Sequence, residues 1–493
     1  MTETAPLTRY APADLRADPG RVVARLFLPG EELPATRSRA GAIVARVLAL
    51  PDSEVEELTA GLLESFSGRH RDYPTLLASH ASIVSSRLGE APRLTDARAL
   101  LLGASFTAEY AVEGAALCNP SAVLHPDQSS LQPGQARVVV SLRGIGEGHI
   151  SSIGFSTAVV GPGARWSFEP RTLPAVAGST IGACWRREHL RAVLTDQGHV
   201  DELSSTVLRA LPAELTSADL EQALAEAHPD LVARPGAHLV VEVLRRLVSS
   251  AYEVEFPAGV ALAQQVLLPA AAEESNGMED ARFVRFIDDD GSVEYRATYT
   301  AYDGRQIASR LLTSPDLRAF RAHRLAGPAA RNKGMALFPR RVGGRYLALC
   351  RSDGENTSLA SSRDGYVWGE PRLVQAPTAC WELLQVGNCG PPVETDRGWL
   401  VLTHGVGAMR TYVIGAILLD LDDPFRMVAR TDRPLLRPAP GERDGYVPNV
   451  VYSCGALVHD GVLWLPYGIG DARIGVAWAS VDELLDRMSP VLR

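Results

Sequence analysis

The stretch Asn276-Gly277-Met278-Glu279-Asp280-Ala281-Arg282-Phe283 sets two adjacent carboxylates beside a guanidinium and runs directly into the apolar segment 283–287. A polar cluster that leads into a buried strand predicts a functional site at a sheet edge. An Asp/Arg ion pair that closes a loop is the alternative, because such pairs also serve structure. The same pattern recurs along the chain, and this recurrence favours the site.

Glycine-containing turns reveal the recurrence. Asp290-Gly291, Gly343-Gly344, Arg397-Gly398 and Asp460-Gly461 each separate two apolar segments, and their second glycines are 53, 54 and 63 residues apart. Pro133-Gly134 is a fifth turn of this kind. Hairpins at such a period are typical of propeller blades, so the sequence predicts a mainly β fold, a five-bladed β-propeller.

Helical patterns precede and interrupt the strands. Apolar residues at helical spacing predict an N-terminal helical region over residues 1–108. The propeller is expected over residues 109–493, with a helical insertion at about 187–252 that contains apolar residues such as Leu244 and Leu247.

Composition narrows the function classes. The chain has 493 residues and a formal net charge of -9, so neither a nucleic acid nor an anionic membrane is the expected partner. Its six cysteines lack metal-ligand spacing, and no segment has the apolar length of a signal peptide or a membrane span. We expect a soluble cytoplasmic protein with no metal site and no cofactor.

Polar clusters flank the predicted hairpins at one end. In an antiparallel pair the start of the first strand lies beside the end of the second, so these clusters should converge around one opening. They contribute carboxylates and cations, namely Asp280, Glu442, Asp471, Arg143, Arg331, Lys333 and His404.

This residue set predicts a reaction. Cleaving a glycoside requires a carboxylic acid that protonates the leaving oxygen. When phosphate is the attacking group, it arrives as an anion and needs cations rather than a second carboxylate as base. One acid with several cations is therefore the set expected of an inverting phosphorylase.

Five ordered motifs carry a family resemblance. They are Asn119-Pro120-Ser121, Met278-Glu279-Asp280-Ala281-Arg282, Arg331-Asn332-Lys333 with Leu337-Phe338-Pro339, Gly398-Trp399-Leu400 with His404-Gly405, and Tyr467-Gly468 before Asp471. The chain resembles glycoside hydrolase family 130, the β-mannoside phosphorylases and β-mannosidases, and its N-terminal region resembles that of a longer branch. The resemblance implies a five-bladed propeller that cleaves β-mannosides with inorganic phosphate, giving mannose 1-phosphate.

The resemblance also implies residue roles. Asp280 is implied as the general acid, acting through the 3-hydroxyl of the bound mannose. The implied phosphate-binding residues are Arg331, Asn332, Lys333, His404 and Arg143, and the implied substrate-binding residues are Asn119, Ser121, Arg282, Tyr302, Glu442 and Asp471.

The chain departs from the family pattern at three positions. Ala281 replaces the usual proline after the acid, Gly334 stands where an aspartate is common, and Gln385 lies near the usual position of a phosphate-binding lysine. Losing that cation would weaken phosphate binding. A β-mannoside hydrolase that uses Glu442 or Asp471 as base therefore stays open, as does a non-catalytic carbohydrate-binding propeller. Helices outside the propeller are expected to favour a homo-oligomer.

Overall fold

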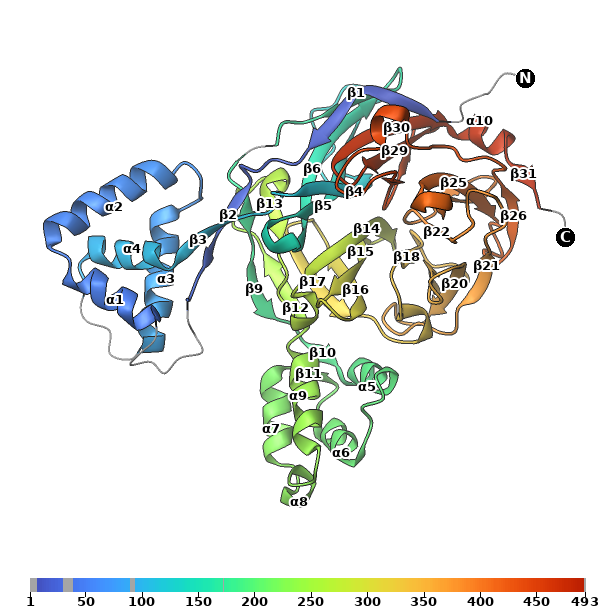
Figure 1. Ribbon diagram of the computed structural model, residues 1–493. Helices are drawn as coiled ribbons and strands as arrows, with labels where there is room; N and C mark the ends of the chain where they lie inside the picture. The colour runs from blue at the N-terminus through green and yellow to red at the C-terminus, as the bar shows by residue number, and fades with distance from the viewer. Residues whose placement is uncertain (1–6, 30–38, 89–93, 172, 492–493) are drawn as a thin grey trace.

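Strands make up most of the structure, a computed structural model that describes residues 7–29, 39–88, 94–171 and 173–491. Figure 1 shows sheets that follow one another around one β body in chain order, with two groups of helices projecting from it. The mainly β fold expected from the sequence is confirmed.

A twelve-stranded sheet contains two antiparallel meanders. The first runs through β4 (Ala116–Leu124), β5 (Ala136–Ile145), β6 (Ser151–Gly161) and β7 (Arg165–Phe168). The second runs through β14 (Gly277–Ile287), β15 (Val293–Tyr302), β16 (Ile307–Ser314) and β17 (Ala319–Arg324). Between β6 and β14 one parallel pairing, Gly277 with Ser151, joins the meanders, and β13 (Gln265–Leu267) pairs with both β6 and β8 (Val176–Ala177).

Three smaller sheets complete the β body. One contains β18 (Ala336–Leu337), β19 (Tyr346–Cys350), β20 (Thr357–Ser362) and β21 (Arg372–Gln375). The next contains β22 (Gln385–Asn388), β23 (Val393–Thr395), β24 (Gly398–Val406), β25 (Tyr412–Leu419), β26 (Met427–Arg430) and β31 (Ser489–Pro490). The last contains β27 (Val451–Tyr452), β28 (Leu457–His459), β29 (Val462–Ile469), β30 (Arg473–Ser480) and β1 (Thr8–Arg16), and α10 (Val481–Asp486) follows β30.

The four helices near the N-terminus form an insertion in a two-stranded ribbon. β2 (Val22–Leu26) pairs with β3 (Thr107–Ala111), and the helices lie between them in sequence: α1 (Arg39–Ala49), α2 (Asp52–Phe66), α3 (Tyr73–Leu88) and α4 (Asp96–Ser105). Residues 1–108 are therefore not all helical, since β1 and β2 precede the helices. β1 pairs antiparallel with β30, with a register shift between Tyr10 and Leu15, and this pairing makes the segment a strand.

A second ribbon carries the other helices. β9 (Ser179–Gly182) pairs with β12 (Tyr252–Glu255), and β12 also pairs with β17. Between them lie β10 (Trp185–Arg186), β11 (Glu214–Leu215), α5 (Arg187–Asp196), α6 (Glu202–Ala210), α7 (Ser217–Ala225), α8 (Pro229–Val232) and α9 (Ala237–Val248). Their apolar faces form a separate core that includes Trp185, Leu190 and Leu244. Figure 1 shows this module apart from the N-terminal helices.

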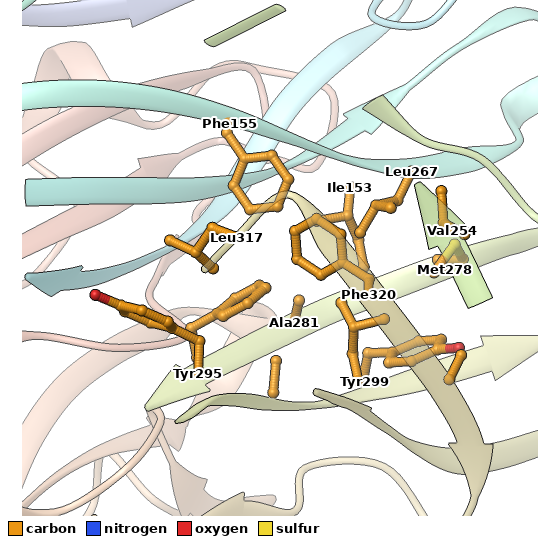
Figure 2. Packing of buried hydrophobic residues seen from close by; sticks show 14 of the residues in the cluster. Ile153, Phe155, Val254, Leu267, Met278, Ala281, Tyr295, Tyr299, Leu317 and Phe320 are labelled. Atoms are coloured by element: carbon orange, nitrogen blue, oxygen red, sulfur yellow. The ribbon is translucent and has the colours of Figure 1, made fainter. Parts of the chain in front are cut away.

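The hydrophobic core between the two meanders positions residues 276–283. Phe155 of β6 packs on Phe320 of β17, with ring centroids 5.8 Å apart, and edge-on against Phe283 of β14. Figure 2 shows Met278 and Ala281 of β14 in the same cluster. Because these apolar side chains bury one face of β14 in the core, the polar side chains of this strand can extend from its other face.

Bulges redirect two strands where the polar residues occur. In β14 the register shifts between Glu279 and Arg282, and Asp280 has a φ of 57°. In β4 it shifts between Cys118 and Ser121, and Asn119 has a φ of 50°. A bulge inserts an extra residue into one strand and re-aims side chains, which is why bulges are frequent beside active sites. Here Met278 and Ala281 both reach the core despite being three positions apart.

Candidate active site

A cavity of about 280 Å³ opens where strand ends from both meanders and all three smaller sheets meet. Its lining includes seven residues predicted from the sequence: Asn119, Arg143, Asp280, Arg282, Lys333, His404 and Asp471. The predicted convergence of polar strand ends is therefore observed for these residues. Their roles stay predictions.

The carboxylate of Asp280 is held by neighbouring donors. Asn119 Nδ2 donates to Asp280 Oδ1 at 2.5 Å, and Arg143 Nη1 donates to the same oxygen at 3.1 Å. Arg282 Nη1 donates to the backbone carbonyl of Asp280 at 3.1 Å, while its Nη2 donates to Tyr452 Oη at 2.8 Å. Both the carboxylate and the bulged backbone of Asp280 are thus fixed by hydrogen bonds.

Electrostatics favour the ionised form of Asp280 in the empty cavity. Burial alone would raise its pKa, but Arg143, Arg282, the hydrogen bond from Asn119 and Lys333 outweigh burial and lower the pKa of Asp280. The residue expected to act as general acid therefore rests here as a carboxylate.

Glu279 links two of the cations. Its Oε1 accepts from Arg143 Nη2 at 2.8 Å and its Oε2 accepts from Lys333 Nζ at 2.7 Å. Lys333 also lies 5.9 Å from the ring centroid of Tyr302. Because Arg143 contacts both Glu279 and Asp280, one guanidinium orients the two adjacent carboxylates.

His404 lines the cavity and is buried. Burial, followed by the charges of Arg351 and Arg282, lowers the pKa of His404 well below its ordinary value. Its Nδ1 lies 3.2 Å from the carbonyl oxygen of Asn388, which can only accept, so Nδ1 carries the proton and Nε2 is an acceptor. His404, counted among the cations from the sequence, is therefore a neutral imidazole.

Arg351 directly follows β19 and lines the cavity. Its Nη1 is buried and has no hydrogen-bond partner within the described residues. A buried guanidinium nitrogen without a partner indicates a place for an anion. Asn388 at the end of β22 lines the cavity too. Arg410, Tyr412 and Tyr452 also line it and were not predicted, because no pattern in the sequence marks them.

Asp471 follows β29 in a tight turn with a φ of 49°. Burial, partly offset by Arg143 and reinforced by the charge of Asp280, raises the pKa of Asp471 to about 6. Its Oδ1 is buried without a hydrogen-bond partner in the described part of the chain. The cavity therefore contains two carboxyl groups whose pKa values are shifted in opposite directions.

The structure places two predicted phosphate-binding side chains outside the cavity lining. Arg331 donates to Asp196 of α5 at 3.1 Å and its side chain is 61% exposed. The Oδ1 of Asn332 accepts from the backbone N–H of Lys333 at 2.7 Å. Although Arg331, Asn332 and Lys333 are consecutive, only Lys333 lines the cavity.

Three predicted substrate-binding residues are also absent from the lining. The Oγ of Ser121 accepts from the backbone N–H of Phe283 at 3.1 Å and so ties β4 to β14. Glu442 accepts from Tyr467 Oη at 3.1 Å and from Arg9 Nη2 at 3.3 Å. Tyr302 donates to the carbonyl of Gly304 at 2.9 Å. In this structure all three bind other parts of the protein.

The sequence departures lie around the same cavity. Gly334 and Gln385 line it, whereas Ala281 faces the hydrophobic core. Gly334 accepts a hydrogen bond from Asn388 Nδ2 at 2.6 Å through its carbonyl. The cavity thus has an amide at Gln385 where a further cation is usual in the resembled family.

No cluster of three or more His, Cys, Asp or Glu residues in the described part of the chain is placed to hold a metal ion. No helix within these residues combines the length and apolar character that crossing a membrane requires.

Comparisons with known proteins assign the family. The glycoside hydrolase family 130 model, described as beta-1,4-mannooligosaccharide phosphorylase, matches residues 259–490. A 1,2-beta-oligomannan phosphorylase of Thermoanaerobacter sp. is 35% identical over 45% of this chain and 75% of its own, and a beta-1,2-mannobiose phosphorylase of that organism is 34% identical over 43% and 70%. The solved beta-1,2-mannobiose phosphorylase of Listeria innocua, in complex with beta-1,2-mannobiose, aligns with a TM-score of 0.44 and 20% identity over 77% of this chain and 93% of that one. On the sequence matches, the chain belongs to glycoside hydrolase family 130.

Proposed function

We propose that the protein is a β-mannoside phosphorylase that inverts the anomeric centre and releases mannose 1-phosphate. Membership of the family and the names of the two Thermoanaerobacter relatives support this activity. The observation that carries the proposal is one cavity that holds Asp280 together with Arg143, Lys333, Arg351 and His404. It has both a carboxyl group for the leaving oxygen and cations for an anionic nucleophile.

Asp280 is the proposed general acid. Its position between Asn119 and Arg143 fixes the carboxyl group toward the cavity, and we assign the proton path to the glycosidic oxygen through the 3-hydroxyl of the bound mannose. Inversion needs one displacement, in which a phosphate oxygen attacks the anomeric carbon as the glycosidic bond breaks. Asn119, Arg282 and Asp471 are the proposed contacts for sugar hydroxyl groups.

Phosphate is the proposed co-substrate, bound by Arg351, Lys333 and His404. The unpartnered Nη1 of Arg351 supplies a donor for a phosphate oxygen. The Nε2 of neutral His404 accepts from the hydroxyl of monohydrogen phosphate, a contact that an imidazolium could not make. Arg331 and Asn332 also remain proposed phosphate contacts. Because Arg331 binds Asp196 in this structure, the turn that contains Lys333 must rotate before these two side chains can reach phosphate.

We further infer that the β body is a five-bladed propeller over residues 109–493. The two meanders and the three smaller sheets follow one another in chain order (Figure 1), and β1 adds to the sheet that contains β30. The helical modules at 1–108 and at about 187–252 are the proposed additions to it. We also propose a cytoplasmic location, because all six cysteines are unpaired thiols. The helices are proposed to hold a homo-oligomer together.

Phosphate dependence tests the function. The protein is incubated with β-1,2- and β-1,4-linked mannobiose, with and without inorganic phosphate, and mannose 1-phosphate and mannose are separated by chromatography. We expect mannose 1-phosphate only when phosphate is present, in equal amount to the released mannose. Mannose release without phosphate would instead establish the hydrolase, with Asp471 or Glu442 as candidate base. Binding without turnover of either disaccharide would establish the non-catalytic carbohydrate-binding protein.

A further inference from the structure

The proposed acid is surrounded by groups that oppose its protonation. Asn119 and Arg143 both donate to Asp280 Oδ1, and Arg282 and Lys333 add positive charge. A general acid must nevertheless supply a proton when the glycosidic bond breaks. The proton must therefore come from another group in the cavity that can reach Asp280.

The surroundings of Asp471 favour a protonated carboxyl group, whereas those of Asp280 favour a carboxylate. Its Oδ1 is buried and has no hydrogen-bond partner within the described residues, and no ion pair of Asp471 is found there. The groups that act on it from the packed elements are Arg143 of β5, Asp280 of β14 and Cys118 of β4. On its own hairpin, the cation Arg473 is 3.5 Å from Asp14 instead. A buried carboxyl group without a cation of its own is stable in the neutral form.

We propose that Asp471 is the proton reservoir of the active site: it carries the proton in the resting enzyme and passes it to Asp280 when the mannoside is bound. This inference rests on the proposed phosphorylase function and assigns a further catalytic residue to it. The path from Asp471 runs through a hydroxyl of the bound sugar, which receives one proton and gives up another. Asp280 then passes the proton to the leaving oxygen through the 3-hydroxyl of the bound mannose.

Over one turnover, Asp471 gives up one proton and takes up one proton. Phosphate enters as the monohydrogen dianion, one of its oxygens bonds to the anomeric carbon, and the bond from that carbon to the leaving oxygen breaks. The leaving oxygen takes the proton that Asp471 supplied. The sugar phosphate departs as a dianion, so the proton that entered on phosphate is returned to the cavity, where Asp471 takes it up. No other reactant is required.

Asp471→Asn is the decisive variant, because an amide keeps the shape and the donor of a neutral carboxyl group but cannot release a proton. We expect kcat to fall by about 10²-fold or more, with the KM for the mannoside within about threefold of its wild-type value as expected when only the reacting step is impaired. In the wild type, kcat/KM should fall as pH rises above the pKa of Asp471, about 6, because the protonated form is lost. That limb should be absent from Asp471→Asn.

The matched control is Asp460→Asn. Asp460 lies at the other end of β29, has a φ of 48° like that of Asp471, and is exposed. It should keep the wild-type rate and pH profile. A residue that only binds sugar would give the opposite result at position 471: a raised KM, an unchanged kcat and a retained alkaline limb, and this outcome would overturn the proposal.

A measurement independent of turnover separates this inference from the phosphorylase proposal. Infrared difference spectra at pH 5 should show a protonated carboxyl band that is present in the wild type and in Asp280→Asn but missing from Asp471→Asn. A band lost in Asp280→Asn and kept in Asp471→Asn would place the proton on Asp280 and overturn the inference. Failure of the wild type to use phosphate at any pH would overturn the proposed function instead, while the infrared result would still report the protonation of Asp471.

Discussion

Asn119 and Asp280 meet across two strands, with Asn119 Nδ2 2.5 Å from Asp280 Oδ1, and each has a positive φ at a bulge of its own strand. Such backbone conformations cost energy for residues other than glycine, on the order of 1–3 kcal/mol each. Their occurrence at both members of one hydrogen bond supports the assignment of this contact to the active site rather than to folding stability.

Asp280→Asn should leave the fold intact and reduce kcat by about 10²–10⁴-fold, the usual contribution of a general acid. The amide retains the volume of the carboxyl group but cannot donate its proton to the leaving oxygen. Phosphorolysis is measured at saturating substrates, and the melting temperature verifies folding. Asp289→Asn, in an exposed turn of the same β14–β15 hairpin, is the control and should retain full activity. Near-native kcat in Asp280→Asn would exclude Asp280 as the acid.

Arg351→Ala should raise the KM for phosphate by about tenfold or more while changing the KM for the mannoside little. Losing one charge-assisted hydrogen bond costs about 1.5–3 kcal/mol. Within the described residues Arg351 Nη1 has no hydrogen-bond partner, so it is free to bind phosphate. Arg331→Ala is the comparison, because Arg331 is exposed and bound to Asp196. Equal effects of both substitutions on phosphate would show that the turn at Arg331 rearranges on binding.

Glu113→Ala should lower the free energy of unfolding by about 3–5 kcal/mol, because it leaves two guanidinium groups without their carboxylate. Arg21 Nε donates to Glu113 at 3.0 Å and Arg171 Nη1 donates at 2.9 Å, and the side chains are nearly inaccessible to solvent. Denaturant unfolding measures the change. Glu221→Ala removes an exposed pair with Arg245 and should change the free energy of unfolding little. Similar losses from the two variants would contradict this account.

Acid should destabilise the junction between the second helical module and the sheet. Burial lowers the pKa of His189 to about 4 and that of His323 to about 3, and the rings lie against Trp185. The unfolded chain binds these protons near pH 6.5, so the unfolding free energy should fall as pH drops from about 6.5 toward 4 and should be insensitive to these groups above pH 7. Melting temperatures across this range measure the effect.

Replacing both histidines by phenylalanine provides the control for the acid effect. The double variant should melt with a shallower dependence on pH below 6.5, because neither ring can then bind a proton. An unchanged slope would assign the acid sensitivity to other groups.

The strand ends were predictable, but the side-chain directions were not. Hairpin chemistry placed Asp280, Lys333, His404 and Asp471 at the same end of their strands, and antiparallel pairing then brings them together. Arg331 shows the limit of this reasoning: its partner Asp196 is contributed by α5, and no local pattern specifies a contact between residues so distant in sequence.

Protonation states and the pairing of strands distant in sequence could not be predicted from the sequence either. The neutral form of His404 depends on burial and on Arg351, which only the folded arrangement supplies. β1 is followed in sequence by β2 but pairs with β30, near the other end of the described chain, so its pairing could not be inferred from adjacent residues.

The pairing of β2 with β3 has a practical meaning for engineering the chain. Since β2 and β3 pair side by side, helices α1–α4 form an insertion whose two attachment points are already neighbours. Deleting the insertion and joining those points by a short glycine-rich bridge would keep β1 covalently attached while removing a whole lobe. The same excision between β9 and β12 would yield a minimal catalytic body for crystallography and would reveal which lobe governs assembly.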